Sequence, residues 1–317
     1  MNILLVTPAP LKINNGNKIT AVRWAGILKK LGHRVRVKQY YDGKACELLI
    51  ALHARRSYDS IKRFRQRHPE LPLIVVLTGT DLYRDIHIDP QAQQSLELAS
   101  RLVALQRLAL RELPKRFRSK TQIIYQSAEP MRVQPVRRRK SFKICVIGHL
   151  REEKDPLRIA MAVRNLPRHS RIQVTHIGEA LDEKLAAKAR AEAAANSRYL
   201  WLGQFSHNKT RAFLARSDLV CITSKMEGSS NVLSEALASG VPVVCSKIPG
   251  LVGTLGQRFA GYFPVGNHRR LRSLLLKSEN DPSFYRKIKR QCRKLAALVK
   301  PQRELAEWRK LLGSLSK

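Results

Sequence analysis

The chain has 317 residues, of which 44% are hydrophobic and 26% charged, and its formal net charge at pH 7 is +36. This length allows one large domain or two ordinary ones with buried cores, and its apolar runs are too short for a membrane span. The N-terminus starts with a strand-like segment and lacks the charged leader and apolar core of a signal peptide, so we expect a soluble, cytoplasmic protein.

The positive charge is spread along the whole chain, where 60 Lys and Arg oppose 24 Asp and Glu. Such an excess concentrates anions near the protein. Nucleic acid, an acidic membrane surface and small polyanionic substrates would each fit. No helix-turn-helix, zinc-finger or RNA-recognition motif is present. We therefore expect small anionic substrates, no specific nucleic acid partner, and at most weak peripheral contact with an anionic membrane.

In the first half, strand-like and helical segments alternate. A first strand at residues 3–7 leads through a loop rich in Pro, Asn and Gly to a helix at 19–31. Further strands are expected at 34–38, 48–52, 73–77, 102–105 and 122–125. This alternation predicts a parallel sheet with helices on both faces.

Residues 129–140 are polar, basic and contain proline, which is typical of a linker. The alternation then resumes, with strands at 143–147, 173–177, 198–202, 219–223 and 241–245 and helices at 156–165, 182–195, 209–215 and 231–239. From residue 268 the chain is mostly helical. We predict two Rossmann-like domains, residues 1–132 and 141–300. Parallel sheets bind ligands at the carboxyl ends of their strands, so two facing domains would form a site in an interdomain cleft.

The loop after the first strand ends in Gly16, Asn17 and Lys18 and opens a helix. The unsatisfied N–H groups of a helix start can bind an anion, and Lys18 and Thr20 are candidates to contact a phosphate or a sugar. An ordinary strand-to-helix turn has the same composition, so both interpretations stay open.

Two further strands of the first half are followed by polar residues. His53 comes after the strand at 48–52, and Thr80 and Asp81 come after the strand at 73–77. These side chains suit hydrogen bonding to a hydroxylated or anionic ligand. A lone histidine is more often structural, however, and the Thr-Gly-Thr sequence also forms good turns.

In the second half, the loop after the strand at 143–147 contains Gly148, Arg151 and Lys154. The two cations are three residues apart, so both can face one pyrophosphate and stabilise charge on a departing phosphate. The alternative is that they are solvated and pair with Glu152 and Glu153.

Residues 226–240 place Glu227 and Glu235 around a loop of small residues that opens a helix. A phosphate at this helix start gains hydrogen bonds and the helix dipole together. Glu235, about one turn into the helix, can accept both hydroxyls of a ribose, and Glu227 on the loop can face the sugar. The residues expected to approach the ligand through their backbone are Gly228, Ser229, Ser230, Asn231 and Val232. The alternative is a capped helix with Glu235 as a solvated surface acid.

The five cysteines include no CxxC pair, and Cys145, Cys221 and Cys245 lie in apolar strand-like runs. Buried, reduced thiols are common in such runs. No Asp-x-Asp pair follows a strand. We therefore expect no disulfide framework, no bound metal and no cofactor.

Together these motifs resemble the retaining family-4 glycosyltransferases of the GT-B fold. The resemblance rests on the Glu-x7-Glu pair, the two glycine loops, Gly32-His33 before the second strand, and a C-terminal helix with Trp308. It implies an α/β protein with two Rossmann-like parallel-sheet domains facing a cleft. It also implies a UDP-sugar as donor substrate, and a last helix at 301–317 that packs back onto the N-terminal domain.

A narrower resemblance is carried by the segments NGNKITAVRWAGIL, ALHARRS, LTGTDLYRD, GHLREEKDP, EGSSNVLSEAL and GYFPVG, which are similar to the selenosugar synthases of selenoneine biosynthesis. It implies transfer of N-acetylglucosamine from UDP-GlcNAc to selenophosphate, giving a 1-seleno sugar. The residues that would act in catalysis are Glu227, Arg151, Lys154 and His53. The residues that would hold the acceptor are Lys18, Thr20, His53, Thr80 and Asp81. The residues that would hold the nucleotide-sugar are Gly16, Asn17, Lys18, Gly148, Arg151, Lys154, Glu227, Gly228, Ser229, Ser230, Asn231, Val232 and Glu235.

This chain departs from the family pattern at three positions. His149 stands where the broad family usually has arginine, Ser230 stands where alanine is more frequent, and Leu251 stands where the close relatives tend to have asparagine. Two other functions stay open. One is a family-4 enzyme that uses a UDP-sugar and a lipid or polysaccharide acceptor at the inner membrane face; the other is a nucleic-acid-binding protein on a degenerate scaffold.

Overall fold

The computed structural model describes residues 1–8, 16–131, 133 and 140–315. Parts of the predicted first loop, of the linker and of the segment 301–317 lie outside the described residues. Contacts divide the chain into two units. The first holds Met1–Ser127, Glu227–Asn231 and Lys300–Lys317, and the second holds Ala128–Met226 and Val232–Val299.

The first unit is built on a six-stranded sheet in the order β2-β1-β3-β4-β5-β6. All of its strand pairs are parallel. The strands are β1 (Asn2–Val6), β2 (Arg34–Lys38), β3 (Leu48–Leu52), β4 (Leu73–Leu77), β5 (Arg101–Ala104) and β6 (Thr121–Ile123). All five residues of β3 and of β4 are apolar and buried, as a parallel sheet covered on both faces requires.

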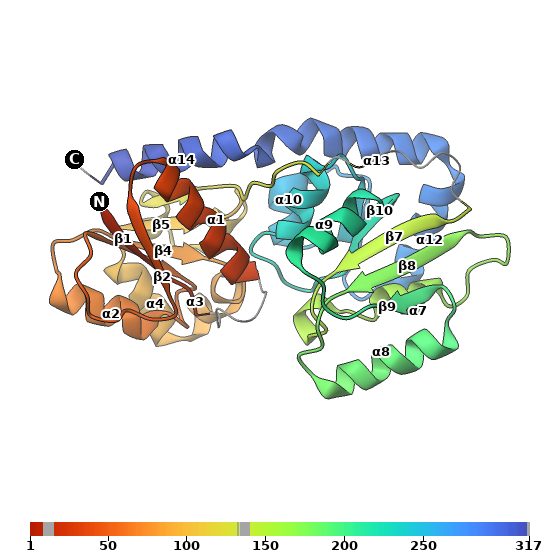
Figure 1. Ribbon diagram of the computed structural model, residues 1–317, viewed down its shortest axis with the longest axis horizontal. Helices are drawn as coiled ribbons and strands as arrows, with labels where there is room; N and C mark the ends of the chain where they lie inside the picture. The colour runs from red at the N-terminus through yellow and green to blue at the C-terminus, as the bar shows by residue number, and fades with distance from the viewer. Residues whose placement is uncertain (9–15, 132, 134–139, 316–317) are drawn as a thin grey trace. The chain divides into compact units, whose positions relative to one another are not determined.

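Helices cover both faces of this sheet (Figure 1). One face packs against α1 (Gly16–Lys30) and α14 (Pro301–Gly313), where the rings of Trp24 and Trp308 meet edge to face at 4.8 Å. The other face packs against α2 (Tyr58–Arg67), α4 (Pro90–Leu98), α5 (Ala109–Glu112) and α6 (Lys115–Arg118). A π-helical turn, Asp81–Asp85, and the short α3 (Ile86–Ile88) follow β4.

The second unit has its own six-stranded parallel sheet, in the order β12-β11-β10-β7-β8-β9. Its strands are β7 (Phe142–Ile147), β8 (Ile172–Ile177), β9 (Tyr199–Trp201), β10 (Leu219–Ile222), β11 (Val243–Ser246) and β12 (Tyr262–Phe263). Side chains alternate between the faces: in β10, Leu219 and Cys221 join one core, and Val220 and Ile222 join the other.

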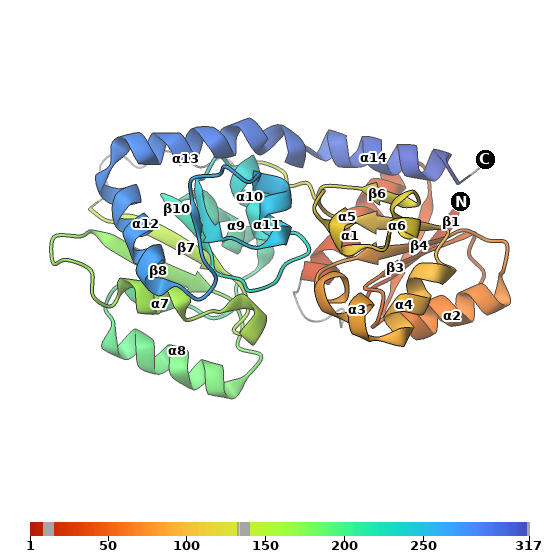
Figure 2. The ribbon, with the colours of Figure 1, turned by 180° about the vertical axis from the view of Figure 1, so that it is seen from behind.

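Helices of the second unit form two layers (Figure 2). One layer contains α7 (Arg158–Val163) and α12 (His268–Asn280), and the other contains α9 (His207–Ala215), α10 (Asn231–Ala238) and α11 (Pro249–Leu255). The unit also contains α8 (Glu183–Ala195), α13 (Pro282–Leu295) and short 3₁₀ turns at Glu152–Lys154 and Ala296–Val299. Two parallel sheets, each covered by helices on both faces, confirm the predicted fold class.

Two further observations concern the described part of the chain. None of its helices is both long enough and apolar enough to span a bilayer. All five cysteines are free and buried, as predicted for Cys145, Cys221 and Cys245. Burial raises the pKa of the Cys145 thiol to about 12, so this thiol is protonated and unreactive near neutral pH.

Candidate functional site

The strand order of the second unit changes direction at β7. The chain runs from β7 to β8 and β9 on one side, and then continues through β10, β11 and β12 on the other. Helices on opposite faces leave a crevice at the carboxyl ends of the two strands that flank such a point. A small cavity lies at the ends of β7 and β10, and it is lined by Val146, Ile147, Gly148, Lys154, Pro156, His176, Cys221, Ile222, Thr223 and Ser224.

Gly148 and Lys154 lie side by side at this cavity. A Cβ atom added to Gly148 would come within 3.7 Å of the Lys154 Cδ atom, so the loop folds the lysine stem over the glycine. Thr223, directly after β10, donates its hydroxyl to the Lys154 carbonyl at 2.8 Å. The backbone that carries the lysine is thereby held to the segment that follows β10.

Arg151 is the N-cap of the 3₁₀ turn Glu152–Lys154, which ends at the second predicted cation, Lys154. The Arg151 side chain is 45% exposed, with Nε 4.0 Å from Oε2 of Glu153. Lys225 pairs with Glu152 at 3.1 Å. The sequence left open that Arg151 pairs with an acid of its own loop, and the structure shows this pair at the long distance of 4.0 Å. The Lys154 side chain, by contrast, lines the cavity.

His176 is one of the residues that line this cavity, and it is buried. One ring nitrogen, Nε2, lies 3.0 Å from the Gly148 carbonyl, and Nδ1 lies 2.9 Å from the Tyr199 hydroxyl. Burial lowers the pKa of His176 to about 4, and the hydrogen bond to Gly148 opposes this only partly. A neutral imidazole therefore forms a hydrogen bond with the carbonyl of Gly148.

The lowered pKa of His176 predicts acid sensitivity. Between pH 6.5 and about 4 the unfolded chain binds a proton that the folded protein does not, so stability falls as pH falls through this window. From pH 7 to pH 5 we expect this group to remove about 2 kcal/mol from the free energy of unfolding. Urea titrations at both pH values, on the wild type and on His176→Gln, measure the effect. The variant should lose correspondingly less stability on acidification, and equal losses would contradict the assignment.

The two predicted glutamates lie on either side of the start of α10. Glu227 is half-buried in the loop, and α10 begins at Asn231. The Glu235 side chain is only 9% exposed, and its Oε1 lies 2.7 Å from Nε2 of His207. The interpretation of Glu235 as a solvated surface acid is therefore wrong. The loop residues Gly228 and Ser230 are buried, while Ser229 and Val232 are half-buried.

In the first unit, the structure brings His53 and Thr80 together. His53 Nε2 lies 2.9 Å from Thr80 Oγ1 and 3.9 Å from Oδ2 of the buried Asp85. The backbone of His53 has φ +74°, which costs energy for a residue with a side chain and is more frequent at functional sites. His53 follows β3, and Thr80 follows β4 and directly precedes the π-helical turn Asp81–Asp85. Such turns are frequent near functional sites.

Asp81 and Thr20 have structural roles that correct their expected contact with the acceptor. Asp81 is fully buried, and its carboxylate accepts hydrogen bonds from the backbone N–H groups of Ala54, Thr78 and Gly79 at 2.8 to 3.0 Å. Thr20 is buried as well; its hydroxyl donates to the Gly16 carbonyl at 2.8 Å and accepts from the Gln126 amide at 2.7 Å. Both side chains therefore form their hydrogen bonds with residues of the first unit.

Gly16, Asn17 and Lys18 form the first turn of α1, which begins three residues earlier than predicted. Gly16 is exposed, and Asn17 and Lys18 are half-buried. The rest of the predicted anion-binding loop, residues 9–15, lies outside the described residues.

One further candidate, His207, was missed by the sequence interpretation. It is the first residue of α9 and pairs with Glu235. Its position after a predicted strand was the available signal, but this does not distinguish it from many other residues. Of the two arginines that follow His53, Arg55 is neutralised by Asp89 at 2.7 Å, whereas the exposed Arg56 has no acidic partner among the described residues.

A family model described as glycosyl transferases group 1 matches residues 127–295, just over half of the chain. The chain belongs to this family. The match contains the Gly148 loop, Lys154 and both glutamates. The protein is therefore a glycosyltransferase, and the crevice between β7 and β10 lies within its family-defining part.

Solved structures with similar folds extend the likeness to the whole of this group 1 glycosyl transferase. One is HepE of Anabaena in complex with UDP and glucose, which is 15% identical to this chain. The match covers 99% of this chain and 100% of that chain, with a TM-score of 0.79. Another is sucrose-phosphate synthase of Thermosynechococcus elongatus, which is 14% identical. This match covers 99% of this chain and 98% of that chain, with a TM-score of 0.77. At such identities the likeness concerns the fold alone. A search of curated proteins finds no match.

Proposed function

We propose that this group 1 glycosyl transferase transfers N-acetylglucosamine from UDP-GlcNAc to selenophosphate, giving a 1-seleno sugar in selenoneine biosynthesis. The observation that carries the donor part is the cavity at the ends of β7 and β10, where Lys154 lies over Gly148. The HepE structure, whose fold is similar, contains UDP and glucose. The acceptor part is supported by the narrower sequence resemblance and by the His53–Thr80 pair, which joins two of its segments.

On the donor side, Lys154 and Arg151 would stabilise the negative charge that develops on UDP as its bond to the sugar breaks. Preorganised charges are worth most in a site from which water is excluded, and the half-buried Lys154 meets this condition better than Arg151. The N–H groups of residues 229–232 would bind the diphosphate at the start of α10. Glu235 would accept the ribose hydroxyls, and Glu227 would hold sugar hydroxyls.

On the acceptor side, the exposed Arg56 adds an unneutralised cation next to His53 and is well suited to attract selenophosphate. A selenium lone pair would form the C1–Se bond while the C1–O bond breaks and its electron pair leaves with UDP. The Se–P bond would then break, with water supplying the fourth oxygen of the phosphate and selenium keeping the bonding pair. Selenium is a strong nucleophile, so the first step needs no strong general base.

Turnover assays test this function. Purified protein should release UDP from UDP-GlcNAc when selenophosphate is added, and should not do so with inorganic phosphate in its place. Mass spectrometry of the same reaction should detect a sugar that contains selenium. Equal turnover with a plain sugar or lipid acceptor would exclude selenophosphate as the specific acceptor, but the protein would still be a glycosyltransferase.

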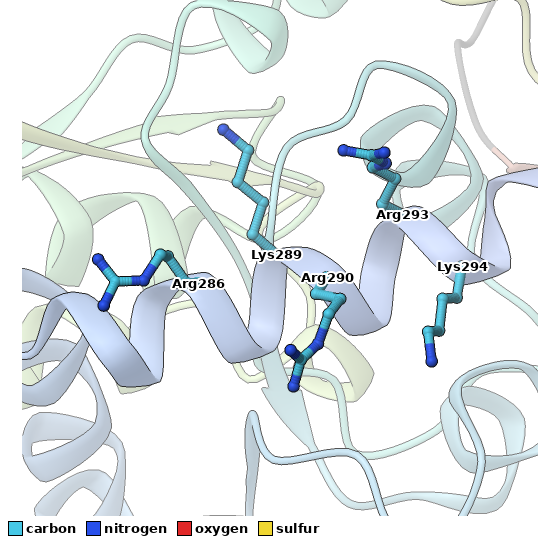
Figure 3. Close-up of a pocket in the computed structure, with 5 residues that line it drawn as sticks. All are labelled: Arg286, Lys289, Arg290, Arg293 and Lys294. Carbon is cyan, nitrogen blue, oxygen red and sulfur yellow. The ribbon is translucent and has the colours of Figure 1, made fainter.

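One observation favours the second candidate, a group 1 enzyme with a lipid acceptor at an anionic membrane. The helix α13 carries six exposed cations and no acid, while Phe284, Ile288 and Cys292 bury its other face. Five of the six cations line a shallow depression, and their side chains extend from the helix in several directions (Figure 3). These five are Arg286, Lys289, Arg290, Arg293 and Lys294. Among the described residues, none of the six forms an ion pair. Each cation near an anionic leaflet contributes about 1 kcal/mol.

Vesicle co-sedimentation separates the two candidates. For the second candidate, the protein should sediment with phosphatidylglycerol vesicles at low salt, remain soluble with phosphatidylcholine, and lose binding when Lys289, Arg290 and Arg293 are all changed to glutamate. It should also transfer sugar to a lipid acceptor. Transfer to selenophosphate without vesicle binding supports the first candidate.

A further inference from the structure

The carboxylate of Glu235 has a partner on a neighbouring helix. Glu235 lies in the second turn of α10, and its Oε1 is 2.7 Å from Nε2 of His207, the first residue of α9. Because an ionised carboxylate only accepts hydrogen bonds, Nε2 carries the proton in this pair. The histidine therefore determines which way the carboxylate group faces.

The chain holds His207 firmly at this place. After β9, Gly203 turns the backbone with φ +67°, and α9 begins behind the N-cap Ser206, whose hydroxyl accepts from the Lys209 N–H. The Ser206 carbonyl in turn accepts from the Thr210 hydroxyl at 3.0 Å. The imidazole thus starts from a capped helix end rather than from a mobile loop.

The pair leaves binding capacity on the carboxylate. In the described part of the chain, no hydrogen bond reaches Oε2 of Glu235. The His207 side chain is 45% exposed, whereas that of Glu235 is 9% exposed. The carboxylate is thus largely buried, with one oxygen held by His207 and the other keeping its capacity to accept hydrogen bonds. Such an oxygen suits a pair of neighbouring hydroxyls on a ribose.

We propose that His207 is a positioning residue that orients Glu235 toward the ribose, and that the pair selects a ribonucleotide over a 2′-deoxyribonucleotide. The inference rests on the proposed function only in taking the donor to be a UDP-sugar. Without His207, the Glu235 carboxylate can rotate, and the order that the pair imposes before binding is lost. Loss of His207 should therefore weaken the binding of the ligand that has both ribose hydroxyls.

Isothermal titration calorimetry with UDP and 2′-deoxy-UDP tests the proposal. The wild type should prefer UDP, and His207→Ala should reduce this preference about fivefold, the size expected for a partly exposed charged hydrogen bond. The loss should come from weaker UDP binding, with 2′-deoxy-UDP nearly unchanged. His207→Gln keeps an N–H donor of similar reach and should restore most of the preference.

Lys209→Ala is the matched control, because Lys209 lies on the same turn of α9 but stacks its ammonium over Phe205 at 3.9 Å. It should keep the wild-type preference. If Glu235→Ala removes the preference and His207→Ala leaves it intact, the role of His207 is refuted while the proposed function stands. If the wild-type protein binds no UDP, the proposed function itself fails, and this inference fails with it.

Discussion

Replacing Lys154 with alanine should lower kcat for sugar transfer by at least about a hundredfold, the cost of removing one preorganised group that stabilises a developing negative charge. The stem of this lysine lies against Gly148 and its carbonyl accepts from Thr223, so the backbone and the stem that carry the ammonium are positioned before the donor binds. The measurement is steady-state release of UDP from UDP-GlcNAc in the presence of selenophosphate. Binding of UDP-GlcNAc should weaken much less than turnover.

Lys225→Ala is a suitable control for this experiment. Lys225 is exposed, and it pairs with Glu152, whose side chain is 87% exposed, so its removal changes the net charge equally but should leave turnover nearly unchanged. Glu227→Ala should also remove most turnover, since no other acid of that loop could hold the sugar hydroxyls. Full activity in both Lys154→Ala and Glu227→Ala would show that the site lies elsewhere in the molecule.

Replacing Glu304 with alanine should destabilise the first unit by about 3 to 5 kcal/mol, the cost of breaking a buried ion pair from one side. Glu304 on α14 is 1% exposed. Its carboxylate accepts from Arg23 Nε at 3.0 Å, from Trp24 Nε1 at 2.6 Å and from the Ser127 N–H at 3.0 Å. The substitution would leave these donors without an acceptor inside the fold.

Urea unfolding followed by tryptophan fluorescence measures this loss, because Trp24 and Trp308 lie at the contact between α1 and α14. Glu307→Ala, one turn further along α14, provides the control. Its carboxylate is half-buried and accepts from the Gln122 amide, which also donates to the Glu307 backbone carbonyl. We expect a change within about 0.5 kcal/mol there. Equal losses in both variants would show that Glu304 has no special role.

The regular elements followed from the sequence because their signals are local. Residues 48–52 and 73–77 are continuous apolar runs, and the strands β3 and β4 have these bounds. The two-residue β12 and the helix α11 were not predicted, since such short elements form through contacts with a neighbouring strand and a core. The early start of α1 was also missed, because Gly16 and Asn17 are weak helix formers.

The residue types at the candidate site were likewise visible in the sequence, but their roles depended on contacts between distant segments. Asp81 follows β4 and Glu235 lies in α10, and the sequence predicted ligand contact for both acids. In the fold, three backbone N–H groups surround Asp81, whereas a single histidine from α9 holds one oxygen of Glu235. Periodicity and composition report what each segment can form by itself. Strand order and helix packing determine which donors reach a given carboxylate, and only the tertiary structure contains that information.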